Sequence, residues 1–171
     1  MKLATISVGI LILVLSSVIC PSAPVEESSV VPYPTAYRTW VMVKSYVITP
    51  ESKLFADRGG IHHYFANDKA IEGYQTGKFP EGAIIVDEGM NIENAQGVTT
   101  ESGLRSVDVM HKDAAFKASG GWGYGRFEGD STIGIASPAI RSACTACHAK
   151  AKGGDHVYST SRLIVPVQPK Q

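Results

Sequence analysis

Cys144-Thr145-Ala146-Cys147-His148, near the C-terminus, decides how the rest of the chain is interpreted. Cysteines three positions apart share one face of a helical turn, and a histidine follows directly. This spacing is typical of c-type haem attachment, in which two thioethers hold the haem edge and the histidine ligates the iron. Chance gives about 0.0015 such runs for this composition. We therefore expect one covalent haem c on Cys144 and Cys147, with His148 as the metal ligand.

Two other interpretations of this motif stay open. A C-x-x-C pair also serves as a redox dithiol, and two cysteines can form half of a zinc site. A zinc site needs further cysteine or histidine ligands at matching spacing, and the sequence has no second C-x-x-C. We favour haem c over both.

Length and charge set the broad class of protein. The chain has 171 residues, which fits one domain of ordinary size with its own core. Its 16 basic and 16 acidic residues balance, so nothing indicates a nucleic-acid partner. Seventeen glycines and nine prolines indicate many turns rather than long helices.

Residues 1–22 are predicted to be a signal peptide. Lys2 supplies a positive start, and residues 6–19 are almost wholly apolar. We favour cleavage of this segment, at a small-residue cleavage site that includes Ser22. The alternatives are a lipidated Cys20 and an uncleaved membrane anchor. Cysteine–haem thioethers form outside the cytoplasm, so the motif agrees with a periplasmic location.

Residues 23–36 are predicted to be a disordered linker that leads to a haem domain over residues 37–171. Four of the nine prolines lie between residues 21 and 36, where no apolar period is found. Within the domain, short apolar or alternating segments predict strands at residues 40–48, 61–66, 83–88, 106–111, 122–128 and 163–167.

Two helices are expected among these strands. Asn67-Asp68 caps a short helix at residues 69–76 that ends at Gly77, and Ser137-Pro138 starts a haem-bearing helix that runs through His148 and stops at Gly153-Gly154. Residues 89–105 are assigned to a loop or hairpin. The pattern predicts a mainly β (α+β) haem c domain, because a helical bundle needs long segments with a 3.6-residue period.

Glycines at 123 and 125 interrupt the strand expected at residues 122–128. Strand glycines let a flat group, either a haem or an aromatic ring, approach the backbone, and a hairpin with bulges is an equal alternative.

Four segments in order, IHHYFAN (61–67), GKFPEGAIIVDE (77–88), VMHKDAAFKASGGWGY (109–124) and ACTACHAKAKGGDHVYS (143–159), resemble the cytochrome P460 family, which includes the cytochromes c′-β. The resemblance covers about residues 40–160. It implies an antiparallel β-sheet packed on a haem c, a homodimer, and five-coordinate iron bound through His148.

Members of that family divide into two functional groups. One oxidises hydroxylamine and carries a lysine bonded to the haem ring, whereas the other binds small gases such as nitric oxide (NO) behind a hydrophobic, phenylalanine-lined distal face. Asp87 stands where the family pattern places the lysine, and Lys78 is the nearest substitute. We therefore expect an NO-binding protein, with hydroxylamine oxidation as the alternative, so that the chain's standing as an enzyme is open.

The candidate residues of the distal pocket are Phe55, Phe65 and Phe79 as apolar walls, Arg58 as a polar group near the iron ligand, and Asp87 with Glu88 as proton acceptors. Each has an ordinary alternative as well. The phenylalanines are equally suited to a core, the arginine to a solvated loop, and the acidic pair to a strand end in water.

A third function is electron transfer by a six-coordinate haem, which needs a distal histidine or methionine. No methionine follows His148, and His62 and His63 are favoured as hydrogen-bonded or solvated strand residues, as His111 and His156 are. In a strand, His62 shares a face with Tyr64. The expected partners are a small gas or a hydroxylamine-like ligand and a periplasmic redox protein.

Overall fold

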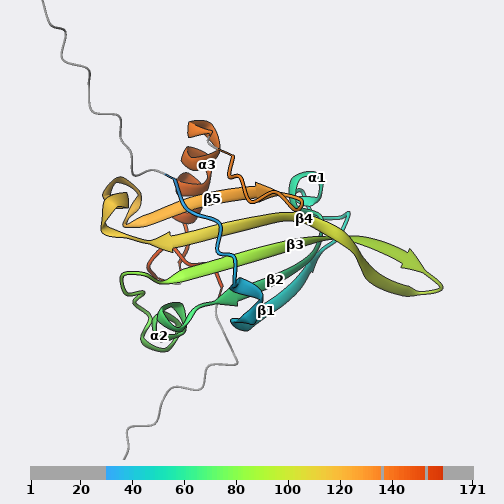
Figure 1. The fold of residues 1–171 in the computed structure, drawn as a ribbon. Coiled ribbons are helices and arrows are strands. Elements are labelled where there is room, and N and C mark those ends of the chain that lie inside the picture. Colours follow the sequence, from blue (N-terminus) through green and yellow to red (C-terminus); the bar gives the residue numbers. More distant parts are fainter. Residues whose placement is uncertain (1–29, 136, 153, 160–171) are drawn as a thin grey trace, which may run out of the picture.

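The computed structural model describes residues 30–135, 137–152 and 154–159, which form one antiparallel sheet with short helices around it (Figure 1). The strands are β1 (Val41–Ile48), β2 (Gly60–Ala66), β3 (Ile84–Ala95), β4 (Val98–Lys112) and β5 (Trp122–Glu128), in that order across the sheet. The α-helices are α1 (Phe55–Arg58), α2 (Asp68–Thr76) and α3 (Pro138–His148), and the 3-10 helices are η1 (Tyr37–Thr39) and η2 (Ala114–Ser119). The predicted mainly β fold class is confirmed. None of the described helices combines the length and apolar character that a membrane span requires.

Residues 89–105 form a hairpin rather than an irregular loop. β3 and β4 stay paired out to Ala95 and Val98, and Gln96-Gly97 makes the turn with φ values of 51° and 80°. This arm projects beyond the rest of the sheet (Figure 1), and most of its residues are exposed on both faces. The predicted strands at 83–88 and 106–111 were too short because an exposed arm needs no alternation of apolar and polar residues.

Alternation along the central strands gives the sheet two distinct faces. The pocket face carries, among others, Tyr64, Ala66, Ile85, Met110, Trp122 and Tyr124, and α2 and α3 pack on it. The opposite face carries Phe65, Val86, Val107, Val109 and Phe127. His62 and Tyr64 therefore share a face, as the alternation in the sequence predicts.

Residues 30–37 cover the opposite face and belong to the folded domain. Val31 is only 3% exposed, and the Tyr33 ring packs edge-on to Phe127 with ring centroids 5.0 Å apart. The linker predicted for residues 23–36 is therefore wrong at its C-terminal end, because Val31 is buried in the core and the partly buried Tyr33 packs against it. The predicted signal peptide and the strand at residues 163–167 lie outside the described residues.

The glycines of β5 leave room on the opposite face, where a Cβ on either one would meet neighbouring side chains. A Cβ on Gly123 would lie 2.4 Å from the Phe116 ring and 2.7 Å from Val31. An aromatic ring, that of Phe116, therefore approaches Gly123 as expected, whereas the approach of a haem to these glycines stays a prediction.

The caps of the two longer helices agree with the sequence. The Asn67 side chain accepts a hydrogen bond from the Ala70 amide at the start of α2, and Gly77 ends that helix with a φ of 77°. Ser137 caps α3 in the same way. α3 ends at His148, ahead of the predicted glycine stop, because the Lys150 amide turns back to the Cys147 carbonyl in a tighter i→i+3 bond.

We expect Gly123→Ala to destabilise the fold by about 1–3 kcal/mol, since its methyl group would overlap the Phe116 ring. Gly125→Ala is the matched control, because its Cβ would meet Val31 only at 3.1 Å and should cost less. Urea unfolding of both variants measures the difference. Wild-type stability in Gly123→Ala would contradict the packing described.

Candidate functional site

The helix α3 brings the two cysteines and the histidine of the C-x-x-C-H motif to one end of the sheet. Cys144 is half-buried against the core of the pocket face, whereas Cys147 is exposed. Both are free thiols, and burial raises the pKa of Cys144. Two free thiols on one turn can each form a thioether with a bound group.

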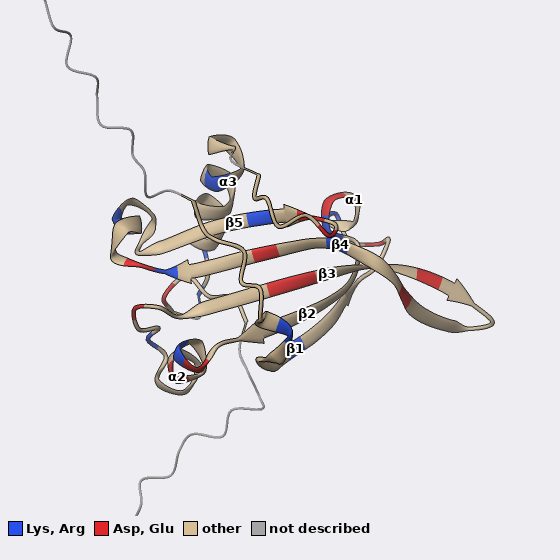
Figure 2. Cartoon of the chain, viewed as in Figure 1, with Lys and Arg blue, Asp and Glu red and all other residues tan. Residues whose placement is uncertain are grey.

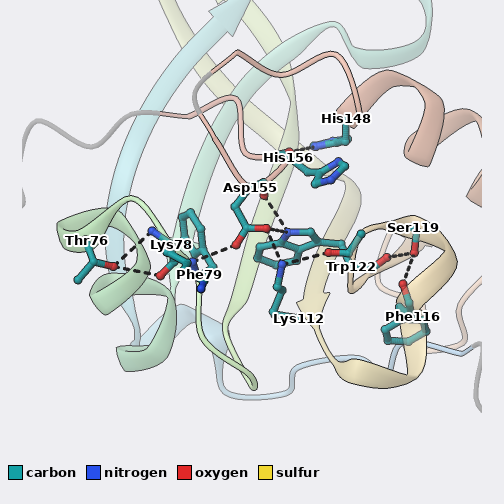
Figure 3. A network of polar contacts seen from close by, with 11 residues as sticks. Thr76, Lys78, Phe79, Lys112, Phe116, Ser119, Trp122, His148, Asp155 and His156 are labelled. Atoms are coloured by element: carbon teal, nitrogen blue, oxygen red, sulfur yellow. Dashed lines mark hydrogen bonds and ion pairs between the residues drawn. The ribbon is translucent and has the colours of Figure 1, made fainter.

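His148 is held in the tautomer that a metal ligand needs. Its Nδ1 lies 2.8 Å from the His156 carbonyl oxygen, which can only accept, so Nδ1–H donates (Figure 3). Burial lowers the pKa of His148. The Tyr124 ring packs against the imidazole with centroids 5.0 Å apart. A neutral imidazole bonded through Nδ1–H leaves Nε2 with a free lone pair.

A small pocket of about 60 Å³, partly open to solvent, lies where α3 faces the sheet. Its lining comes from α1, the strands and α3: Arg58, Tyr64, Ile85, Asp87, Asp108, Val109, Met110, Tyr124, Gly125, Cys144 and His148. Cys144 and His148 of the motif therefore share one cavity with a set of charged side chains.

Arg58 bridges two carboxylates on neighbouring strands of the pocket. Its guanidinium donates to Asp87 on β3 and, at 3.1 Å, to Asp108 on β4. Arg126 on β5 lies 3.6 Å from Asp108, and Figure 2 shows this run of acidic and basic residues across β3, β4 and β5. Burial raises the pKa of Asp108, and the attraction of Arg58 and Arg126 offsets only part of that increase. Asp108 is therefore a carboxylate suited to exchanging protons.

His62 is buried with both ring nitrogens engaged. Nδ1 lies 2.7 Å from an Asp87 oxygen and Nε2 lies 2.7 Å from the Arg58 carbonyl oxygen. Burial lowers the pKa of His62, but these bonds more than offset it, so that the pKa is raised overall. A carbonyl and a carboxylate both accept, so the ring is an imidazolium without a free lone pair. It cannot ligate a metal in this state.

The structure brings together only some of the predicted site residues. Arg58, Asp87, Cys144 and His148 line one pocket, whereas none of the three predicted phenylalanines does. No phenylalanine lines this pocket, so the hydrophobic, phenylalanine-lined distal face stays a prediction.

The three phenylalanines lie elsewhere for separate reasons. Phe65 is on the opposite face, where its ring packs against Tyr37. Phe79 is in the core beneath α2, edge-on to Trp122. Phe55 begins α1 and packs over Gly59. Lys78, the substitute for the cross-linking lysine, is exposed after α2 and does not line the pocket.

Asp87 and Glu88 are both buried, at 5% and 6% exposure, so the expected charge pair in water is wrong. They point to different faces, since successive residues of a strand alternate. Asp87 joins the pocket, whereas Glu88 accepts from the Tyr37 hydroxyl at 2.6 Å and from Arg38 at 2.7 Å.

The pocket residues that sequence reasoning missed include Tyr64, Asp108, Met110 and Tyr124. Alternation offered a partial signal. Val107 and Val109 face the opposite side of the sheet, so Asp108 and Met110, which alternate with them, share the other face. The sequence therefore indicated a carboxylate on the face away from these valines, but not which face α3 would cover.

The residues present fit a haem c. Tyr124 is 7% exposed and lines the pocket, yet its hydroxyl has no hydrogen-bond partner among the described residues, as expected of a group that faces a ligand. Within residues 30–159, the described part contains no group of three or more His, Cys, Asp or Glu side chains arranged to hold a metal ion by themselves. That leaves the zinc interpretation without a ligand set there.

Comparison with known proteins agrees with this site. A family model described as Cytochrome P460 matches residues 34–159, which include the sheet, the pocket residues and α3. No curated protein matches the chain.

We expect His62 to stabilise the fold most at low pH. The pKa of His62 in the folded protein lies above the ordinary histidine value of 6.5, so its contribution is complete below pH 6.5 and is lost as pH rises through the folded pKa. The difference in unfolding free energy between wild type and His62→Gln, from urea titrations over a pH series, should therefore shrink with rising pH. A constant difference would argue against a buried imidazolium.

Proposed function

The chain belongs to the cytochrome P460 family and is a haem c protein, and from that premise we propose that it binds small nitrogen-oxide ligands such as NO in the polar pocket beside α3. In this proposal Cys144 and Cys147 would hold one haem through thioethers, and His148 would ligate its iron through Nε2. When bound, the haem would supply an iron centre able to take a small ligand.

The state of His62 carries this proposal. A six-coordinate electron carrier needs a histidine or methionine on the far side of the iron, and His62 has no lone pair to give. Met110 is the one methionine among the pocket-lining residues, and it is packed in the core with Trp122 and Tyr124. Both observations support an iron with a position left for an external ligand.

Arg58 and Tyr64 give the pocket its polar character. The Arg58 guanidinium is fixed by Asp87 and Asp108, so it presents donors without the entropy loss of ordering a free side chain. The Tyr64 hydroxyl is 3.2 Å from that of Tyr46. Such groups favour a ligand with a polar end over a purely apolar gas.

A second candidate is oxidation of hydroxylamine, which the pocket carboxylates favour. This reaction removes protons along with electrons, and Asp108 has the raised pKa of a proton acceptor. No lysine is among the residues that line the pocket in the described part of the chain. We propose that any such activity proceeds without a lysine–haem bond.

Export to the periplasm completes the proposal. It is supported by the apolar segment at residues 6–19 and by thioether chemistry that takes place outside the cytoplasm. A periplasmic redox protein would then exchange electrons with the haem, and a homodimer stays the expected assembly.

We expect the purified ferrous protein to be high-spin and to bind NO, because the pocket offers the iron no second side-chain ligand. Absorption and electron paramagnetic resonance spectra measure both properties. Met110→Leu is the control and should leave the spin state unchanged. A low-spin ferrous spectrum that becomes high-spin in Met110→Leu would contradict the proposal.

If the second candidate holds, Asp108→Asn should lower the rate of hydroxylamine oxidation by about 10²–10⁴-fold, the usual worth of a general base. NO binding should survive the change. Glu128→Gln, an exposed carboxylate on β5, is the matched control. Equal rates in wild type and Asp108→Asn would remove Asp108 from the chemistry.

A further inference from the structure

We propose that Asp155 is a positioning residue for His148, acting through the turn whose carbonyl accepts the Nδ1–H of the histidine. The inference rests on the proposed function, in which His148 ligates the iron. Asp155 lies outside the pocket-lining residues, so its effect would pass through the backbone of its neighbour, His156.

Asp155 is tied to three separate parts of the molecule (Figure 3). Its carboxylate accepts from Lys112 Nζ at 2.5 Å, from the Phe79 amide at 3.0 Å and from Trp122 Nε1 at 3.2 Å. Its backbone carbonyl also accepts from Trp122 Nε1, at 2.8 Å. The end of β4, the start of β5 and the loop after α2 are thereby joined to a single residue.

The backbone conformation at Asp155 has to be held by contacts of this kind. Asp155 and His156 both have positive φ, at 47° and 63°, a region that is unfavourable for residues other than glycine. Two consecutive residues hold this conformation only where surrounding contacts determine it. The bonds to Lys112, Phe79 and Trp122 are those contacts, and they aim the His156 carbonyl at His148.

Lys112, at the end of β4, holds the Asp155 carboxylate from the side of the sheet. Its ammonium lies 5.0 Å from the Trp122 ring centroid and also donates to the Gly120 carbonyl at 3.1 Å. Asp155 and Lys112 have side chains that are each 16% exposed, so solvent competes little for the pair. Burial opposes the charge of Asp155, but its hydrogen bonds, led by that of Lys112, lower its pKa overall.

The consequence is electronic as well as geometric. A histidine that donates Nδ1–H to a fixed acceptor becomes a stronger donor at Nε2, and loss of that acceptor weakens the ligand. A stronger donor stabilises ferric over ferrous iron. Releasing the turn should therefore raise the reduction potential of the haem and weaken the iron–histidine bond.

The test uses the exported, haem-loaded protein and two variants of graded severity, Asp155→Asn and Lys112→Met. We expect both to raise the reduction potential, measured by spectroelectrochemistry, and to lower the iron–histidine stretching frequency in resonance Raman spectra of the ferrous protein. Asp155→Asn should give the larger shift, since it alters the acceptor of all three donors. Glu88→Gln is the matched control, because it removes a buried carboxylate from the opposite face.

Each outcome decides the inference. A folded Asp155→Asn or Lys112→Met protein with the potential and stretching frequency of Glu88→Gln would overturn the positioning role and leave the proposed function standing. Absence of the iron–histidine band in the wild type, or its persistence in His148→Ala, would overturn both. Graded shifts confined to the Asp155 and Lys112 variants would support the inference.

Discussion

The alternation of side chains along five antiparallel strands is the constraint on which this molecule depends. One face buries apolar residues beneath residues 30–37, which frees the other to combine a core with a charged pocket. Because successive residues face opposite ways, Asp87 and Glu88 serve different faces although they are neighbours in sequence. The pocket therefore needs no separate domain, because it is built on one face of a sheet whose opposite face already stabilises the fold.

Arg58 holds the polar part of that face together. A buried carboxylate without a partner is costly, and loss of one partner of a buried pair costs about 3–5 kcal/mol. Arg58 spans Asp87 and Asp108, while His62 binds both Asp87 and the Arg58 carbonyl. The same bonds that make the charges tolerable remove the lone pairs of His62. Stability and ligand access are therefore set by one network.

The sequence predicted local features well, but it did not predict which residues from distant parts of the chain contact one another. The C-x-x-C-H helix, the caps at Asn67 and Ser137, and the central strands follow from short-range rules. The sequence could not place Phe65 and Phe79 relative to the pocket, because alternation tells which residues share a face, but not which face α3 covers. Asp108 joins Arg58 across fifty positions, and Val31 enters the core from a proline-rich segment. Such contacts are tertiary, so composition and period do not reveal them.

A crystal structure of the haem-loaded protein with NO bound would test the account most directly. We predict thioethers at Cys144 and Cys147, His148 Nε2 on the iron, and Arg58 among the side chains nearest the ligand. The Nδ1 of His62 should still contact Asp87. Iron ligated by His62 or Met110, or a haem seated away from the pocket of Arg58, Asp87 and Asp108, would contradict it.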